Sequence, residues 1–461
     1  MTLIKSISGI RGTIGGQVND GLTPLDAVKF AAAYGTWLKD TNPNQKLKVV
    51  IGRDARISGP MISALVISTL TGLGIDVIDL GLSTTPTVEI AVPMEKAQGG
   101  IILTASHNPK QWNALKLLNQ KGEFISGAEG ERILELAEKE AFNFAEVDDL
   151  GIITEDSSYL QKHIDAVLAL PLVDKKAIAA ADFHVVVDAV NSTGGIFVPA
   201  LLKALGVNRV TEMYCEPTGH FPHNPEPLPE HLTDLSAKII ETKADVGITV
   251  DPDVDRLALV CEDGSMFGEE YTLVACADYV LTHTPGATVS NLSSTRALRD
   301  VTEEKGQTYA AAAVGEVNVV AKMKEVNAII GGEGNGGIIY PESHYGRDSL
   351  VGIALFLSSL AHKKMTVSQM RDSFPKYVIS KNKIELTPEI NVDKVLADIA
   401  KKYEGYEVDT IDGVKIYIEK EWVHLRKSNT EPIIRIYSES QTAEKANALA
   451  EKIIGEIKGL I

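Results

Sequence analysis

The chain has 461 residues, and at about 100–200 residues per domain this length predicts three or four domains. Its formal net charge of −17 and the lack of a long basic run exclude a general nucleic-acid-binding surface, whereas a small anion with local cations around it is allowed. Three widely spaced cysteines exclude a zinc site or disulfide framework and favour a reducing cytoplasm. No stretch of about 18 apolar residues occurs, so we expect no membrane segment.

Residues 1–155 alternate short β-branched runs with helical stretches, which predicts βαβ units and a sheet covered on both faces. Strands are expected at 49–51 and 77–80, and an amphipathic helix at 24–39 with Thr23 as its cap. Arg11 lies between glycines, so we expect a guanidinium on a flexible turn. A solvated surface arginine is the alternative.

The sequence Thr104-Ala-Ser-His-Asn-Pro109 follows an apolar, β-rich run, so Ser106 is expected where a buried strand ends. A serine hydroxyl is a weak nucleophile that needs a base, a metal or prior modification, which makes Ser106 a candidate catalytic residue. A polar turn ended by Asn-Pro is the alternative. Lys116 follows ten positions later, and neighbouring cations can lower a lysine pKa far enough for acid or base catalysis.

Residues 156–261 predict a second α/β unit with strands at 183–189 and 244–250. The second strand ends in Asp251-Pro-Asp-Val-Asp-Arg256, whose three carboxylates repel one another unless a cation lies among them. Mg²⁺, a hard ion that prefers oxygen ligands, is the leading candidate. A calcium EF-hand loop is disfavoured because the glycine and the late glutamate are missing, and a solvated acidic turn is the remaining alternative.

Residues 262–375 predict a third α/β unit, with helices at 269–283, 294–305 and 350–361 and strands at 287–291 and 326–330. The loop Gly331-Gly-Glu-Gly-Asn-Gly-Gly337 follows, and its glycines allow the backbone to approach a ligand closely. Glu333 and Asn335 offer an acceptor and a donor to hydroxyl groups. A tight hairpin without a ligand is the alternative.

Residues 376–461 change character and predict the order β-α-β-β-β-α, with a hairpin at Asp412-Gly413 and a closing helix at 442–458. Between the last strands lies Arg426-Lys-Ser-Asn-Thr-Glu-Pro432, a donor-rich stretch suited to a phosphate group. An ordinary loop of Ser, Asn and Pro is the alternative.

These four loops, taken in order, resemble the four signature loops of the α-D-phosphohexomutases, and the resemblance covers the whole chain. It implies three similar α/β domains with mixed sheets plus a C-terminal, TATA-box-binding-like α+β domain around a central cleft. The expected domain bounds are residues 1–155, 156–261, 262–375 and 376–461. The implied enzyme interconverts hexose 6-phosphate and hexose 1-phosphate through a phosphoserine and a 1,6-bisphosphate, which also serves as activator.

The resemblance also implies a role for each candidate residue. Ser106 carries the phosphoryl group and, with Asp251, Asp253 and Asp255, holds one Mg²⁺ per active site. The other implied catalytic residues are Lys116, Arg11 and His107. The implied substrate-binding residues are Arg256, Glu333, Asn335, Arg426, Ser428, Asn429 and Thr430. Small sugar phosphates are the expected partners, with no nucleic acid or membrane, in a cytoplasmic monomer or dimer.

The chain departs from the family pattern at several positions. Pro252 and Val254 stand where many members have glycine, and Asn335 and Gly337 stand where many bacterial members have Ser and His. The sequence at 112–116 and the glycine-rich loop resemble the phosphoglucosamine mutases, so glucosamine 6-phosphate is the expected substrate, with mannose and glucose phosphates as the alternative. A non-catalytic sugar-phosphate-binding protein would be expected to lose Ser106 or a metal carboxylate, and a phosphatase would differ only in letting water reach phosphoserine.

Overall fold

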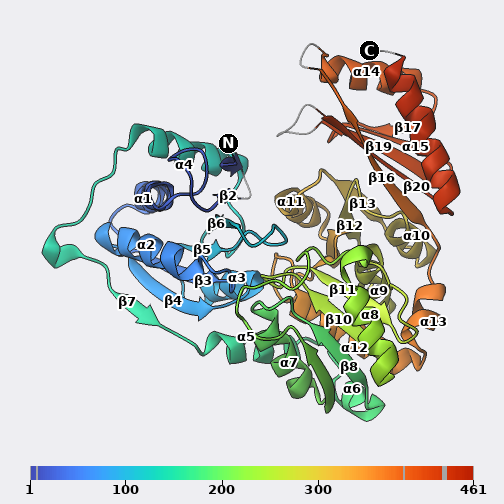
Figure 1. Ribbon diagram of the computed structural model, residues 1–461, viewed down its shortest axis with the longest axis horizontal. Helices are drawn as coiled ribbons and strands as arrows, with labels where there is room; N and C mark the ends of the chain where they lie inside the picture. The colour runs from blue at the N-terminus through green and yellow to red at the C-terminus, as the bar shows by residue number, and fades with distance from the viewer. Residues whose placement is uncertain (1, 7–8, 388–389, 428–432, 460–461) are drawn as a thin grey trace. The chain divides into compact units, whose positions relative to one another are not determined.

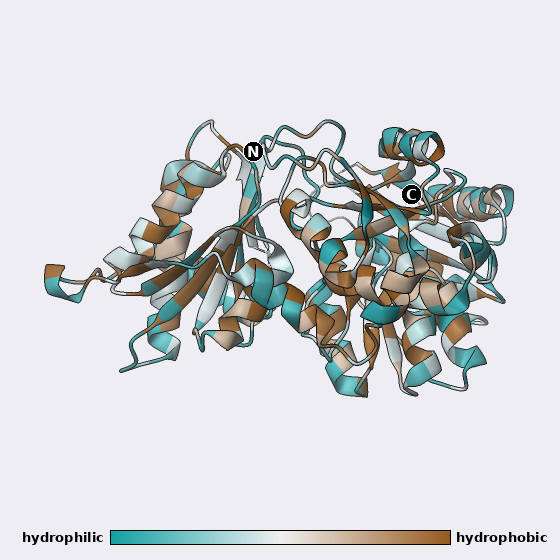
Figure 2. Ribbon diagram, turned by 90° about the horizontal axis from the view of Figure 1, so that it is seen from below, coloured by the Kyte–Doolittle hydropathy of each residue, from teal (hydrophilic) through white to brown (hydrophobic). Residues whose placement is uncertain are grey.

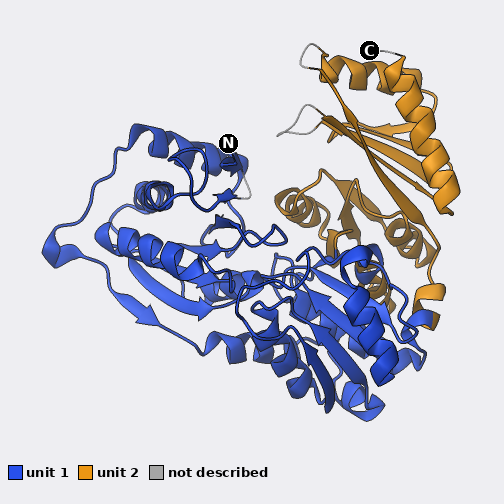
Figure 3. Cartoon of the chain, in the orientation of Figure 1, with its two compact units in different colours: residues 1–272, 336–368 blue, residues 273–335, 369–461 orange. Residues whose placement is uncertain are grey.

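The computed structural model describes residues 2–6, 9–387, 390–427 and 433–459. The chain folds into two compact units, shown in Figure 3. The first unit comprises residues 1–272 and 336–368, and the second comprises residues 273–335 and 369–461. The predicted signature loops 104–109 and 251–256 lie in the first unit. Glu333, Asn335 and Arg426 lie in the second.

The first sheet of unit 1 has seven strands in the order β1-β2-β6-β5-β3-β4-β7. These are β1 (Ile4–Ser6), β2 (Gly9–Thr13), β3 (Lys48–Arg53), β4 (Asp76–Leu82), β5 (Gly99–Leu103), β6 (Trp112–Leu118) and β7 (Ile153–Glu155). The associated helices are α1 (Pro24–Thr41), α2 (Gly59–Gly72), α3 (Thr85–Met94) and α4 (Gly127–Lys139). The predicted cap of α1 is confirmed, because the Thr23 side chain accepts from the Asp26 N–H in a capping box.

Alternation along the strands places two hydrophobic cores on opposite faces of this sheet. Val49 and Ile51 of β3 pack in the core shared with α1, α2 and α4, whereas Val50 packs in the core shared with α3. Figure 1 shows the helices on the two faces, and Figure 2 shows hydrophobic residues along the strands. Covering both faces leaves the ends of the strands and their loops as the place for polar groups.

The second sheet of unit 1 has the order β11-β10-β8-β9. Its strands are β8 (His184–Asp188), β9 (Arg209–Met213), β10 (Val246–Val250) and β11 (Leu257–Cys261). Unit 1 also contains η1 (Val147–Asp149), α5 (Tyr159–Leu168), α6 (Lys175–Ala181), α7 (Gly194–Leu205), η2 (Pro229–His231), α8 (Thr233–Thr242), β15 (Gly337–Ile339) and α12 (Ser349–Lys363). Strands β10 and β11 pair antiparallel, so residues 251–256 form the turn that joins them.

Unit 2 begins with a parallel group of strands in the order β13-β12-β14. Its elements are β12 (Thr288–Asn291), α10 (Ala297–Glu304), β13 (Tyr309–Ala312), α11 (Glu316–Val326) and β14 (Ile330–Glu333), while α9 (Glu269–His283) and α13 (Val367–Asp372) span the unit boundaries. The predicted strand at 326–330 is wrong. Helix α11 continues to Val326, Asn327 ends it in a left-handed conformation with φ 51°, and β14 starts only at Ile330.

The C-terminal part of unit 2 is a five-stranded antiparallel sheet in the order β16-β20-β19-β18-β17. Its elements are β16 (Val378–Glu385), α14 (Val392–Lys402), β17 (Glu407–Asp409), β18 (Val414–Ile418), β19 (Glu421–Lys427), β20 (Ile433–Ser440) and α15 (Ala443–Lys458). The predicted order has one strand fewer than the sheet, because four strands, β17 to β20, follow α14. The closing helix is confirmed, with Thr442 as its cap.

Candidate active site

Ser106 lies directly beyond β5, on the loop that leads into the antiparallel strand β6. Its backbone adopts φ 48°, a left-handed conformation that costs an ordinary residue about 1–2 kcal/mol, so the surrounding contacts must hold it there. Its N–H donates to Thr104 Oγ1 at 2.9 Å. Its Oγ donates to Asp251 Oδ2 at 2.6 Å, which brings together the two loops that the sequence singled out.

The aspartate loop is a tight turn whose three carboxylates are all fully buried. Asp251 Oδ1 accepts from the N–H groups of Asp255 and Arg256 at 3.2 and 3.1 Å, which folds the turn back on its first residue. Val254 stands at φ 64°, a conformation that glycine adopts without strain and a β-branched residue rarely does. The Val254 N–H donates to the Asp251 carbonyl, and its own carbonyl accepts from the Ser349 N–H.

The cluster fits a divalent cation. One oxygen from each of Asp251, Asp253 and Asp255 lies within 4.8 Å of the others. Asp253 Oδ1 and Asp255 Oδ1 are buried and have no hydrogen-bond partner among the described residues. Buried carboxylate oxygens without donors are costly unless a cation occupies the space between them, and an all-oxygen set suits a hard ion.

Two basic side chains form ion pairs with carboxylates of the cluster. Lys116 Nζ lies 2.7 Å from Asp253 Oδ2 and 3.5 Å from Asp255 Oδ2, and Arg347 Nη2 lies 2.7 Å from Asp255 Oδ2. Thr85 at the start of α3 adds a hydroxyl that donates to Asp253 Oδ2 at 2.5 Å. These donors contact Oδ2 of Asp253 and Oδ2 of Asp255, so the two Oδ1 atoms, which are buried without a hydrogen-bond partner among the described residues, remain available to a cation.

The burial and charges of this site shift its pKa values in opposite directions. Burial, followed by the charges of Asp255 and Asp253, raises the pKa of Asp251 well above its ordinary value. Burial acts to raise the pKa of Asp255 as well, but Arg347, Lys116 and Arg256 outweigh it and lower that pKa. The three carboxylates are therefore electrostatically unequal.

The expected lowering of the Lys116 pKa is not found. Burial acts to lower it, but the contacts with Asp253 and Asp255 dominate and raise the pKa above its ordinary value. His107, which follows the serine, has the opposite shift. Burial and then the charge of Arg256 lower its pKa to about 2.

Arg11 is on a strand, not on the predicted flexible turn. It occupies the middle of β2, paired with Ile4 on one side and Ala114 on the other, so the strand fixes the direction of its guanidinium. Burial and then the charge of Arg256 lower its pKa. Arg256 itself lies 3.7 Å from Glu226, measured between its Nη1 and Glu226 Oε1. Arg11, His107 and Arg256 thus belong to the same electrostatic environment in unit 1.

The remaining predicted residues lie in unit 2 or outside the described residues. Glu333 is buried at the end of β14, where its Oε1 accepts from Asn291 Nδ2 at 2.8 Å and from the Gly315 N–H at 3.1 Å. Asn335 is half-buried on the same loop. Arg426 on β19 forms an ion pair with Asp412 at 2.9 Å. Ser428, Asn429 and Thr430 fall outside the described residues.

One glycine of the loop at residues 331–337 serves packing within unit 1. Gly336 has φ 88°, and a Cβ there would lie 2.3 Å from the carbonyl oxygen of Leu257. The Leu257 N–H also donates to the Gly336 carbonyl at 3.0 Å. At this position the chain itself, not a ligand, requires the close backbone approach that the sequence predicted.

Sequence reasoning missed Thr85 and Arg347, which both contact the aspartate loop. Thr85 follows a strand as part of a Thr-Thr-Pro sequence that reads simply as a helix start. Arg347 precedes Asp348, whose side chain caps α12, and nothing in the sequence indicates which residue the arginine faces. Arg56 belongs to the sequence Gly52-Arg-Asp-Ala-Arg56, a charged turn after the predicted strand at 49–51 and therefore placed where a ligand site could lie, and its side chain is fully buried.

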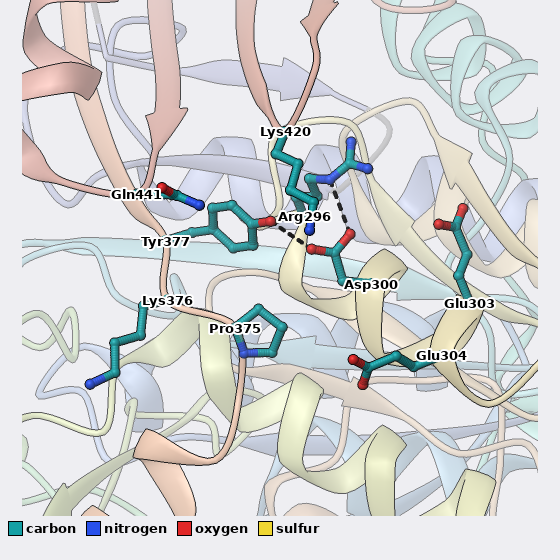
Figure 4. A pocket seen from close by; sticks show the side chains of 9 residues that line it. All are labelled: Arg296, Asp300, Glu303, Glu304, Pro375, Lys376, Tyr377, Lys420 and Gln441. Carbon is teal, nitrogen blue, oxygen red and sulfur yellow. Dashed lines mark hydrogen bonds and ion pairs between the residues drawn. The ribbon is translucent and has the colours of Figure 1, made fainter.

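Unit 2 contains a cavity of about 360 Å³ (Figure 4). Its charged lining comprises Arg296, Lys376, Lys420, Asp300, Glu303 and Glu304. Asp300 accepts from Tyr377 Oη at 2.6 Å and from Arg296 Nε at 3.0 Å. The three basic and three acidic side chains have no net formal charge, and the lining includes none of the predicted site residues. Among the described residues, no helix is long and apolar enough to cross a membrane.

The folds and the serine beside a buried carboxylate cluster together define a multidomain α/β protein with a candidate phosphoryl-transfer site. Comparison with known families matches four consecutive domains of phosphoglucomutase/phosphomannomutase. Alpha/beta/alpha domains I, II and III match residues 3–144, 161–264 and 268–377, and the C-terminal domain matches residues 383–456.

Full-length relatives agree with this result. A phosphoglucomutase/phosphomannomutase of Thermococcus kodakarensis is 36% identical over 446 residues, covering 95% of this chain and 96% of the relative. A probable phosphoglucosamine mutase of Methanopyrus kandleri is 31% identical and covers 98% of this chain and 97% of the relative. The crystal structure of a putative phosphomannomutase from Thermus thermophilus superposes with a TM-score of 0.84 at 26% identity, covering 99% of both chains.

The chain therefore belongs to the phosphoglucomutase/phosphomannomutase family, within the α-D-phosphohexomutase superfamily. It is a mutase, an enzyme of the isomerase class that interconverts hexose phosphates. The predicted family, fold class and activity class are confirmed. A non-catalytic binding protein is not supported.

Proposed function

We propose that this enzyme transfers a phosphoryl group between Ser106 and a hexose monophosphate. The observation that carries the proposal is the 2.6 Å contact between Ser106 Oγ and Asp251 Oδ2, inside a buried three-carboxylate cluster. A serine in this place solves its weak nucleophilicity by entering the cycle already phosphorylated and acting as donor. The negative charge that develops on the phosphoryl group during transfer would then lie beside the cluster, where a bound cation would stabilise it most strongly.

The cluster suits Mg²⁺, held by Asp251, Asp253 and Asp255 together with an oxygen on Ser106. Bound there, the ion would supply Lewis-acid charge neutralisation for the phosphoryl group. The chain's own residues prepare this site in two ways. Lys116, Arg347 and Thr85 hold the Oδ2 atoms of Asp253 and Asp255, and burial of the loop shields the carboxylates from solvent.

In the proposed cycle the phosphorus–oxygen bond to Ser106 breaks as a bond to the free sugar hydroxyl forms. As these bonds exchange, the sugar hydroxyl gives up its proton and the Ser106 oxygen gains one. Lys116, Arg11 and His107 are the residues proposed to assist this proton transfer and to stabilise the charge. The product is a hexose 1,6-bisphosphate, which also serves as activator. After the bisphosphate turns over, its other phosphoryl group returns to Ser106 and the second monophosphate leaves.

Substrate recognition is assigned to one residue of unit 1, Arg256, and to residues of unit 2. Glu333 and Asn335 would bind sugar hydroxyls, and the phosphate that does not react would be held by Arg426, Ser428, Asn429 and Thr430. These roles are distributed over four domains, for which we propose the bounds 1–155, 156–261, 262–375 and 376–461.

Glucosamine 6-phosphate, converted to glucosamine 1-phosphate, is the proposed preferred substrate. A probable phosphoglucosamine mutase is among the full-length relatives, and so is a phosphoglucomutase/phosphomannomutase, which makes mannose and glucose phosphates the second candidates. The Glu333 carboxylate could accept from a 2-ammonium group, and a charged donor strengthens such a bond to roughly 1.5–3 kcal/mol, enough for about tenfold selectivity or more.

A substrate panel tests the sugar assignment. We expect kcat/KM for glucosamine phosphate to exceed that for mannose and glucose phosphates by about tenfold or more, each assayed with Mg²⁺ and the matching bisphosphate. A tenfold preference for mannose phosphate would overturn the sugar assignment and leave the mutase mechanism standing. Loss of the preference in Glu333→Gln, with the other sugars less affected, would trace it to the carboxylate.

Arg426→Ala is expected to raise KM for every sugar phosphate by a similar factor. A guanidinium on the distal phosphate binds monophosphate and bisphosphate alike and does not contact the reacting hydroxyl. Steady-state kinetics with the three sugars measure the effect. Arg299→Ala is the matched control, because that arginine pairs with the surface acids Glu303 and Glu407. A loss confined to one sugar would contradict the assignment.

A further inference from the structure

Arg56 is the largest charged side chain that is completely buried in unit 1, and the reaction scheme gives it no part. It lies between β3 and α2, on the loop next to the serine loop. An arginine is almost never fully buried unless its charge and its donors are matched. The groups that pair with the charge and the N–H donors of Arg56 therefore indicate what this residue does.

All five N–H donors of the Arg56 guanidinium have an acceptor. Nε donates to Asp54 Oδ2 at 3.0 Å. Nη1 donates to the carbonyls of Pro109 and Trp112, at 2.7 and 3.0 Å, and Nη2 donates to the carbonyls of Ser106 and Asn108, the latter at 2.6 Å. Four of the five acceptors are therefore backbone carbonyls of the segment from Ser106 to Trp112, including that of the serine itself.

The counter-ion of Arg56 holds the same loop from its other end. Asp54 Oδ2 also accepts from Thr104 Oγ1 at 2.7 Å, and Thr104 Oγ1 in turn accepts from the Ser106 N–H at 2.9 Å. Ser106 is thus fixed through both its N–H and its carbonyl by one buried ion pair. This explains how a non-glycine residue is kept at φ 48°.

The Arg56 segment also contacts the aspartate loop. The Ala55 N–H donates to Ser192 Oγ at 3.3 Å, and Ser192 Oγ donates to the Pro252 carbonyl at 2.7 Å. The ring of Phe221 covers the guanidinium with its centroid 5.1 Å from Cζ. The short segment 54–56 therefore donates hydrogen bonds directly to the serine loop and is linked to the aspartate loop through the Ser192 hydroxyl.

We propose that Arg56 is a positioning residue for phosphoryl transfer, which holds the backbone of Ser106 so that its oxygen faces the aspartate cluster. The proposal rests on the proposed function of Ser106. Lysine cannot replace it, because three donors on a flexible stem cannot satisfy five acceptors arranged around a planar fork. The serine oxygen would then be displaced from the cluster, and a misplacement of about 1 Å can cost about 100-fold in rate.

The test uses the full-length protein as wild type, Arg56→Lys and Arg53→Lys. Dephosphorylated protein is mixed with hexose 1,6-bisphosphate and Mg²⁺, and phosphorylation of Ser106 is followed by quenched intact-mass measurement and peptide mapping. Arg53 is the matched control. It is the last residue of β3, three positions before Arg56, and its Nη1 donates to the Asp54 carbonyl at 3.3 Å. Mg²⁺ affinity by calorimetry and Tm are measured in parallel.

We expect Arg56→Lys to phosphorylate Ser106 about 100-fold more slowly than wild type, with a folded structure, Mg²⁺ affinity near that of wild type and KM within about threefold. Arg53→Lys should behave as wild type. A wild-type rate in Arg56→Lys overturns the proposal, and so does a parallel loss of Tm and Mg²⁺ affinity, which would make Arg56 a general scaffold residue. Failure of wild type itself to become phosphorylated at Ser106 overturns the proposed function instead.

Arg56→Ala provides an independent readout. Guanidinium ion added at a concentration that leaves the wild type folded should enter the vacated space and raise the phosphorylation rate toward that of wild type. Ammonium ion at the same ionic strength should not, because it lacks the planar fork. Equal effects of the two cations would overturn the proposal. If Arg56→Ala does not fold, Thr104→Val replaces it, and a wild-type rate in that variant contradicts the role of the Asp54–Arg56 pair.

Discussion

Ser106→Ala should lower kcat by at least about 10³-fold, because it removes the oxygen that carries the transferred group. The change deletes only one oxygen in a loop, so we expect the protein to remain folded. The lost contact is the 2.6 Å bond to Asp251, and Asp251 keeps the bonds from the backbone N–H groups of Asp255 and Arg256. The measurement is steady-state kinetics, with circular dichroism to verify the fold.

Two observations make the Ser106 result specific. Ser68→Ala is the matched control and should keep wild-type activity, because Ser68 is exposed on helix α2 of the same unit. Peptide mapping of active wild-type protein should locate a phosphoryl group on Ser106. Activity above a tenth of the wild-type value in Ser106→Ala, or a phosphoryl group found only on another residue, would contradict the assignment.

The fold class and the loop positions followed from local patterns. The strand residues 49–51 and 246–250 are buried on both faces of their sheets, so in the sequence they form continuous, mainly apolar runs. A charged loop follows each of these runs. The pattern failed where a single residue in a left-handed conformation decides the element. Asn327 ends helix α11 within the run 326–330, which the sequence predicted to be a strand.

The sequence predicted the aspartates of the candidate site and three of its cations, Lys116, Arg11 and Arg256, but not Arg347 and not the pairing between cations and carboxylates. Three aspartates at alternating positions can be recognised because their mutual repulsion requires compensation within a short stretch. The residues that provide it come from distant segments. Lys116 is 137 positions from Asp253, Arg347 is 92 positions from Asp255, and Arg56 is 50 positions from Ser106. Only the folded chain shows which arginine contacts which carboxylate.

Asp253→Asn should weaken Mg²⁺ binding by at least about tenfold and lower kcat/KM in proportion at limiting Mg²⁺. Asparagine has the same shape and can still accept from Thr85 Oγ1, but it removes one of three charged ligands. It also removes the negative charge that faces Lys116 Nζ at 2.7 Å, so of the two carboxylates that pair with this ammonium only Asp255, at 3.5 Å, keeps its charge. Calorimetric titration with Mg²⁺ measures the affinity directly.

Thermal unfolding separates metal binding from any change in the fold. A ligand that binds only the folded state stabilises it by RT ln(1 + [L]/Kd), so a tenfold weaker Kd removes up to about 1.4 kcal/mol at saturating Mg²⁺. The informative quantity is the difference in Tm with and without Mg²⁺ for each variant, because effects of the mutation on the metal-free protein cancel. Asp263→Asn, an exposed acid just beyond β11, should leave this difference unchanged. If Asp253→Asn kept the full Mg²⁺-dependent rise in Tm, the aspartate loop would not be the metal site, and the charge compensation required by three buried carboxylates would have to come from Lys116, Arg256 and Arg347 alone.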